Sequence, residues 1–282
     1  MQTLFDCLDL KINQRALLAC LLIGFSNGYV SAFVVLRKSA LKIGTLSHGL
    51  LPGIVLAVMV AGLSDWNVLL GAIFAALFIG LGSLFVARTS RLDQDTALGI
   101  LYSGGFAAGL ILVWKMGIRQ QLDEWLFGSL VGMTDDALWI AWGISALSVL
   151  TLAILQRPLL ILLFEPNVAA SLGVPVRLLN YALLGIVILV LVSSLQAVGC
   201  ILSVAMLITP AATIAMFSDD ASTLFRGGGI LGGVASCVAF FLSWKLDWPA
   251  GSTVVLLLVT IFLLSYIFSP KYGILRAGRK HS

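Results

Sequence analysis

The chain has 282 residues, of which 60% are hydrophobic and only 11% are charged, and its mean hydropathy is +1.07. A soluble domain carries about 25% charged residues, so this composition excludes a soluble globular protein and indicates one that lies largely within a membrane. The net charge of +4 calls for no nucleic acid partner, because basic loops that face anionic membrane lipid account for it.

Apolar runs of about 20 residues, long enough to cross ~30 Å of hydrocarbon as a helix, recur along the whole sequence. Lipid offers no partners for backbone amides, so each run is predicted to be helical. The sequence therefore predicts an all-α, polytopic transmembrane helix bundle that forms a single domain over residues 1–282. Its nine predicted spans are, in chain order, Ala16–Leu36, Leu46–Leu63, Trp66–Ala87, Thr96–Trp114, Ala137–Leu155, Leu178–Leu195, Val198–Phe217, Gly228–Leu246 and Ala250–Phe268.

The basic residues predict the orientation of these spans. If successive spans alternate, 12 of the 17 lysines and arginines share one side of the membrane and the other five lie opposite. Cytoplasmic loops carry the excess of positive charge, so the N-terminus is predicted to be outside and the C-terminus cytoplasmic. The stretch Leu178–Phe217 has no charged turn, and eight spans is the alternative count if it is not divided.

The first residue that a plain membrane helix does not explain is His48, at the start of the second predicted span. An ionisable group at membrane depth usually faces a polar cavity, a partner or a transported ion. His48 is therefore a candidate metal ligand, and Ser47 beside it a candidate pathway residue. The alternative is a packed, hydrogen-bonded interior histidine. The pair is a poor nucleophile and base, because adjacent helical side chains point about 100° apart.

The longest predicted cytoplasmic connection covers residues 156–177. Glu165 and Pro166 have the sequence of a helix start, because proline favours the first helical position. The short helix continues through Ala169 and is expected to end at Gly173. It is either an interfacial helix that rests on lipid or a docking element for a cytoplasmic protein.

Two residues mark irregular points in the sixth and seventh predicted spans. Gln196 lies at the turn between these spans, where it either contacts a transport path or caps the turn. Pro210 interrupts the seventh span, because proline removes an i→i−4 hydrogen bond and frees the carbonyl of Met206. It is a candidate hinge, with plain helix packing as the alternative.

Small residues spaced four apart predict close helix packing. These glycine pairs are Gly24/Gly28, Gly105/Gly109, Gly228/Gly232 and Gly229/Gly233. Between the fourth and fifth spans, Thr134 is expected to cap the fifth helix through its hydroxyl.

The chain lacks the G-x-x-x-x-G-K-[ST] phosphate loop and the H-E-x-x-H and C-x-x-C metal motifs. It is therefore expected to be a non-catalytic protein without a permanently bound cofactor. An intramembrane enzyme is disfavoured for the same reason.

Five segments in order resemble the membrane subunits of bacterial ABC importers for manganese, zinc and iron. They are RKSALKIGTLSHGLLPG (37–53), DQDTALGI (93–100), LFG (126–128), EPNVAASLG (165–173) and VGCILSVAMLITPAAT (198–213). The resemblance implies the permease subunit of an ATP-driven importer in the bacterial inner membrane, with a divalent metal as its substrate. It also implies a separate cytoplasmic ATPase, a second permease subunit in a homo- or heterodimer, and an external metal-binding receptor. Glu165, Pro166, Ala169 and Gly173 match the family's ATPase-coupling loop.

One position departs from the family pattern. The family has aspartate four residues before the histidine, where this chain has Gly44. Residues four apart share a helix face, so aspartate and histidine could hold the same ion, whereas glycine removes the carboxylate that manganese favours. Either a second, different permease subunit supplies the carboxylate, or the pathway holds metal weakly, as conduction allows.

The alternative function is a stand-alone secondary transporter or channel for a small ion. Such folds place ionisable residues at the membrane midplane, whereas the span interiors here carry almost none.

Overall fold

The computed structural model describes residues 11–117, 128 and 134–271. Within these ranges all regular elements are helices, which confirms the predicted all-α class. The helices are α2 (Lys11–Leu36), α3 (Ala40–His48), α4 (Leu51–Ala61), α5 (Asp65–Thr89), α6 (Gln94–Met116), α8 (Asp135–Phe164), α9 (Pro166–Ser171), α10 (Val176–Val198), α11 (Cys200–Met206), α12 (Thr209–Ala215), α13 (Ala221–Leu246) and α14 (Ala250–Phe268). Eight of the described segments are long and apolar enough to cross a membrane, with α3 and α4 counted together.

The cytoplasmic connection predicted for residues 156–177 is shorter than the sequence suggested. Helix α8 continues to Phe164 with Pro158 inside it. Proline removes one backbone hydrogen bond from a helix, but the apolar run after Pro158 still continues the helix. Helix α8 is 30 residues long, and α9 begins two residues after its end. The connection between α8 and α10 is therefore residues 165–175. Thr134 accepts a bond from the backbone N–H of Ala137 at 3.1 Å, which confirms its predicted capping role.

The predicted seventh span is divided into two short helices, α11 and α12, as the proline signal indicated. These helices connect opposite ends of the bundle. Arg37, just after α2, donates to Asn180 near the start of α10 at 2.9 Å, so α10 starts where α2 ends. Helix α13 runs antiparallel to α2, because Gly24 lies against Gly232 and Gly28 against Gly228. The nine-span count stays a prediction that depends on this broken segment.

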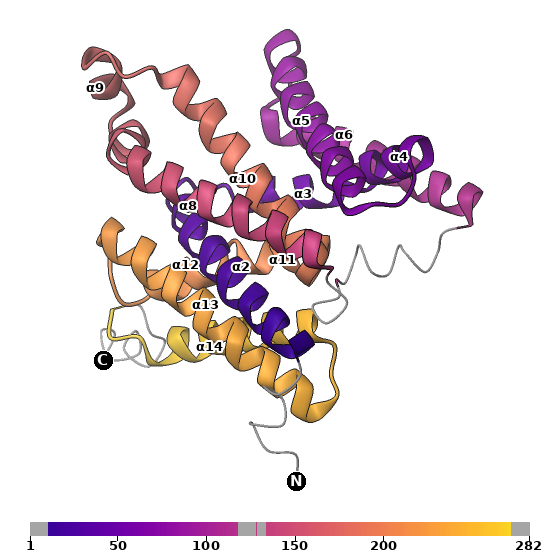
Figure 1. Ribbon diagram of the computed structural model, residues 1–282. Helices are drawn as coiled ribbons and strands as arrows, with labels where there is room; N and C mark the ends of the chain where they lie inside the picture. Colours follow the sequence, from indigo (N-terminus) through magenta and orange to yellow (C-terminus); the bar gives the residue numbers. More distant parts are fainter. Residues whose placement is uncertain (1–10, 118–127, 129–133, 272–282) are drawn as a thin grey trace.

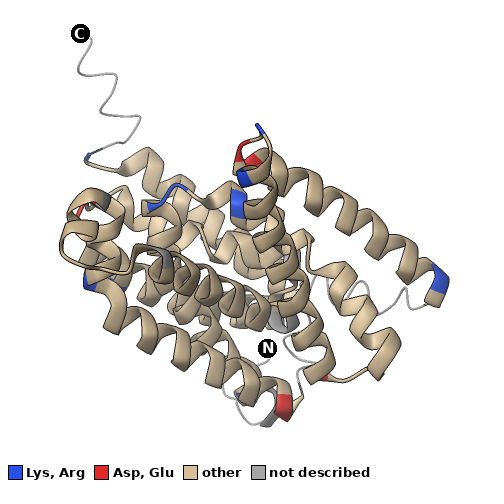
Figure 2. Cartoon of the chain, turned by 90° about the horizontal axis from the view of Figure 1, so that it is seen from above, with Lys and Arg blue, Asp and Glu red and all other residues tan. Residues whose placement is uncertain are grey.

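Charged residues gather at helix ends and turns, while the helix middles are apolar (Figure 2). Among the described residues, three ion pairs join such ends: Arg15 to Asp135 at 2.7 Å, Lys42 to Asp95 at 2.9 Å, and Lys271 to Asp219 at 2.8 Å. Each pair joins residues that alternating spans would place on the same side. The locations of the two termini stay predictions, and residues 1–10 and 272–282 lie outside the described part.

Helices α2 and α13 pack through their glycines, as the four-residue spacing predicted. A Cβ atom at Gly28 would lie 2.1 Å from the carbonyl oxygen of Gly228, and one at Gly24 would lie 2.5 Å from that of Gly232. We call these four residues the glycine interface. No side chain larger than hydrogen fits between the two backbones there.

A second close backbone contact, which the sequence did not predict, joins α4 to α5. A Cβ atom at Gly53 would lie 2.2 Å from the carbonyl oxygen of Gly71. Helix α6 packs against the same pair, and a Cβ atom at Gly109 would lie 3.0 Å from the backbone nitrogen of Pro52. Figure 1 shows α4, α5 and α6 as one group of helices beside a second group that includes α2, α8, α10 and α13.

Candidate functional site

The helix break after α3 fixes the position of His48, the last residue of that helix. Pro52 has no N–H to donate to the carbonyl of His48, and its ring crowds that carbonyl. At this proline the helix is interrupted between His48 and Leu51. The chain turns instead through tighter bonds from Gly49 to the carbonyl of Leu46 at 3.1 Å and from Leu50 to that of Ser47 at 3.3 Å. The imidazole therefore projects from the end of a short helix inside the predicted second span.

The imidazole of His48 is half-buried and lies against two aromatic rings of α6. Its centroid is 6.0 Å from that of Tyr102 and 6.0 Å from that of Phe106. Within the described residues it makes no side-chain hydrogen bond. The packing expected of an interior histidine is thus present without the hydrogen bond, and the ring nitrogens are available to a ligand.

Ser47, next to His48, and Gly44, one helical turn before it, differ in their contacts. Ser47 is buried, and its hydroxyl donates to the carbonyl of Gly44 at 2.8 Å, within its own helix. Gly44 has room for a side chain, since a Cβ atom there would meet Val204 of α11 only at 3.7 Å.

Metal-binding side chains are sparse around this site. Residues 11–117, 128 and 134–271 contain no group of three or more histidine, cysteine, aspartate or glutamate side chains that could hold a metal. From one chain, the described residues therefore supply a single imidazole rather than a complete coordination sphere.

The break between α11 and α12 lies at Leu207 and Ile208, just before Pro210, which is buried in the first turn of α12. The backbone N–H of Ala211, next in the chain, donates to the hydroxyl of Ser31 on α2 at 3.1 Å. Ser31 in turn donates to the carbonyl of Gly28 at 2.6 Å. A side chain of α2 therefore stabilises the first turn of α12. A single serine in an apolar run carries no sequence signal of such a contact.

Gln196, the other predicted pathway residue, lies in the last turn of α10. Its side chain is outside the described part of the structure. Helix α10 ends two residues later, and Gly199 then has a positive φ of 85° before α11 begins.

The predicted coupling segment forms α9, with Pro166 in its first turn as expected. The helix ends in a Schellman motif: Val174 donates to the carbonyl of Ala169 at 3.0 Å, and Gly173 donates to that of Ala170 at 3.1 Å. Gly173 has a φ of 72°, a conformation that favours glycine.

Helix α9 lies on the surface of the bundle. Ala169 is fully buried and anchors it, whereas Glu165 is exposed. Val168 and Leu172 expose 45% and 65% of their surfaces, so the helix presents apolar side chains at one end of the bundle. The side chain of Pro166 lies outside the described part.

Comparison with known proteins extends these observations over nearly the whole chain. Residues 9–269 match the ABC 3 transport family. The chain is 34% identical over 263 residues to the manganese transport system membrane protein MntC of Halalkalibacterium halodurans, covering 93% of this chain and 89% of that protein. It is 31% identical to the chelated iron transport system membrane protein YfeD of Yersinia pestis, covering 91% of this chain and 85% of that protein.

A solved structure shows the same fold. PsaBC from Streptococcus pneumoniae, in complex with Fab, matches with a TM-score of 0.88 at 31% identity. The match covers 98% of this chain and 100% of that one.

Proposed function

Because the chain belongs to the ABC 3 transport family, we propose that it is the permease subunit of an ATP-driven importer of divalent metal ions. It moves manganese, zinc or iron across the bacterial inner membrane as a multi-pass protein. The observation that carries this proposal is similarity over the full length to membrane proteins of manganese and chelated iron transport systems. The bundle of long apolar helices supplies the membrane-spanning part of such a system.

ATP hydrolysis is assigned to a separate cytoplasmic subunit, since this chain has no phosphate loop. A second permease subunit completes the translocation path, and an external receptor delivers the metal. The metal is substrate, and no permanently bound cofactor is proposed.

His48 is proposed as a transient ligand on the metal path. Its half-buried ring, without a side-chain hydrogen bond in the described residues, supports this role. Imidazole suits zinc, iron and related ions, whereas manganese favours carboxylates. One imidazole without the carboxylate that Gly44 lacks binds weakly, which suits an ion that must also leave. Ser47 and Gln196 are proposed to line the path, and a second permease subunit to add further ligands.

Helix α9 is proposed as the surface that the ATPase pushes. Its buried Ala169 and the fixed turn at Gly173 support this role, because they hold the helix firmly on α8 and α10. Closure of the ATPase dimer on ATP would then move α9 and the helices on either side of it. The break at Pro210 is the proposed hinge that lets the bundle change between outward-open and inward-open shapes.

The function is tested by manganese uptake into proteoliposomes that contain this chain with its ATPase, second permease subunit and receptor. We expect uptake only when ATP and the ATPase are both present. Equal uptake driven by an ion gradient without the ATPase would instead identify a secondary transporter.

A further inference from the structure

A cavity of about 270 Å³ lies where the two groups of helices meet, between α3, α5 and α6 on one side and α2 and α10 on the other. We call this boundary the seam. Apolar side chains form most of the cavity wall, among them Phe33, Leu46, Leu98, Leu183 and Val187. Side chains meet across the seam: a Cβ atom at Gly80 of α5, for example, would meet the side chain of Leu184 of α10 at 3.7 Å.

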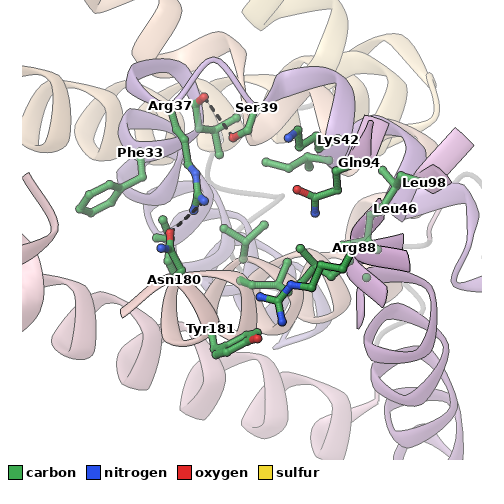
Figure 3. A pocket seen from close by; sticks show the side chains of 17 residues that line it. Phe33, Arg37, Ser39, Lys42, Leu46, Arg88, Gln94, Leu98, Asn180 and Tyr181 are labelled. Carbon is green, nitrogen blue, oxygen red and sulfur yellow. Dashed lines mark hydrogen bonds between the residues drawn. The ribbon is translucent and has the colours of Figure 1, made fainter. Parts of the chain in front are cut away.

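Three basic side chains surround this cavity from three separate elements (Figure 3). Arg37 follows α2, Lys42 belongs to α3, and Arg88 lies in the last turn of α5. None of the residues that line the cavity is acidic. The site therefore combines an apolar wall with an excess of positive charge at its rim.

The partners of these cations leave positive charge available. Arg37 donates to the neutral oxygen of Asn180 at 2.9 Å. Lys42 pairs with Asp95 at 2.9 Å, but both side chains are more than one-third exposed, so water weakens that pair. Arg88 has no acidic partner among the described residues. An anion of suitable size would contact two guanidinium groups that no carboxylate neutralises.

The same charges exclude two classes of ligand from the cavity. A divalent cation would be repelled by three basic side chains and would find no carboxylate in the lining. A purely apolar ligand would remove water from the cations without providing a counter-charge. A ligand with an anionic head and an apolar chain matches both parts of the lining.

We propose that the cavity binds an anionic phospholipid, with its phosphate at Arg37 and Arg88 and an acyl chain along the apolar wall. The location fits, because Arg37 follows one apolar span and Arg88 ends another, which places both guanidinium groups at the level of lipid headgroups. Basic pockets between membrane helices are known sites for such headgroups, and guanidinium groups bind phosphate oxygens in pairs. A bound lipid would bridge the two groups of helices. The proposal does not depend on which metal is carried.

The test is native mass spectrometry of the full-length chain, titrated in detergent with phosphatidylglycerol or with phosphatidylcholine. We expect preferential binding of phosphatidylglycerol, weakened about fivefold by Arg88→Gln and about fivefold by Arg37→Gln, as expected for one basic residue each. Arg91→Gln is the matched control, because Arg91 is an exposed cation just after the end of α5 and does not line the cavity. It should leave binding unchanged.

A second variant tests the apolar wall while all charges remain. Gly80→Leu adds a side chain at the wall, and we expect it to weaken phosphatidylglycerol binding as strongly as Arg88→Gln. Inorganic phosphate at the same concentration should not displace the lipid. Equal binding by wild type, Arg88→Gln and Gly80→Leu would overturn the proposal. So would an equal loss with Arg91→Gln, or complete displacement by inorganic phosphate.

Discussion

The glycine interface and the seam are two helix boundaries of opposite character in one small bundle. At the glycine interface the backbones of α2 and α13 touch, and a Cβ atom at Gly28 would lie 2.1 Å from the opposite carbonyl oxygen. At the seam, side chains meet around a cavity of about 270 Å³. Close-packed interfaces resist small displacements, so relative motion within the bundle is easier at the seam than at the glycine interface.

This difference bears on the proposed change between outward-open and inward-open shapes. His48 of α3 lies on the seam side of the molecule, against α6. Ser31 lies on α2 and accepts a hydrogen bond from Ala211, which attaches α12 to the group of helices that contains the glycine interface. The candidate ligand and the candidate hinge therefore belong to different groups of helices. Substitutions in the two groups should therefore have different effects.

Gly28→Leu should abolish correct folding, because no displacement of a side chain can relieve its overlap with a backbone carbonyl. Overpacking a core costs about 1–3 kcal/mol when side chains can shift, and here they cannot. Size-exclusion chromatography after membrane extraction measures the folded fraction. Gly143→Leu is the control, because a Cβ atom there meets nothing within 4 Å. An equal folded fraction for Gly28→Leu and Gly143→Leu would contradict the claim that the glycine interface has no room for a side chain.

Gly173→Pro should nearly abolish transport while leaving membrane insertion intact. Proline is fixed near a φ of about −65°, whereas Gly173 has a φ of 72°, so the variant disrupts the end of α9. Gly173→Asn should keep most activity, since asparagine tolerates this conformation. Metal uptake and metal-stimulated ATPase activity are measured together. Normal stimulation in Gly173→Pro would contradict the coupling role of α9.

Gly44→Asp should fold normally and raise manganese uptake severalfold. The space around a Cβ atom at position 44 accepts a side chain, and a carboxylate one turn before His48 adds the hard ligand that manganese favours. Gly44→Asn matches the size without the charge and should leave uptake unchanged. Uptake that rises equally in both variants would mean that charge is not the cause.

Ser31→Ala should produce the smallest effect, a loss of about 1 kcal/mol of stability. The variant leaves the backbone N–H of Ala211 without its acceptor at the start of α12. Thermal unfolding compares it with Ser148→Ala, whose hydroxyl has no partner in the described structure. A larger loss from Ser148→Ala would show that Ser31 does not stabilise the break.

The features that the sequence predicted well have local signals. Each such signal works through the backbone of the residues that carry it. The examples are the four-residue glycine spacing, Pro210 within an apolar run, and Glu165-Pro166 before a short helix. Glycine spacing does not say which helices pair, so the contact of Gly53 with Gly71 was missed. The extent of α8 was underestimated because a helix flanked by apolar residues tolerates Pro158.

The cavity could not be predicted because its residues are far apart in the chain. Arg37, Lys42 and Arg88 each have the sequence context of an ordinary cytoplasmic basic residue. Only the packing of α3 and α5 against α2 and α10 brings them around one space. The bond from Ala211 to Ser31 is missed for the same reason, since 180 residues separate its partners.

The most direct test of the account is ATP-dependent manganese uptake by His48→Ala, in proteoliposomes with the ATPase, second permease subunit and receptor. His281→Ala, which alters the other histidine of the chain, is the matched control. We predict that the initial uptake rate falls on the order of tenfold in His48→Ala, that basal ATPase activity stays unchanged, and that His281→Ala behaves as wild type. Unchanged uptake by a folded His48→Ala variant would contradict the placement of His48 on the metal path.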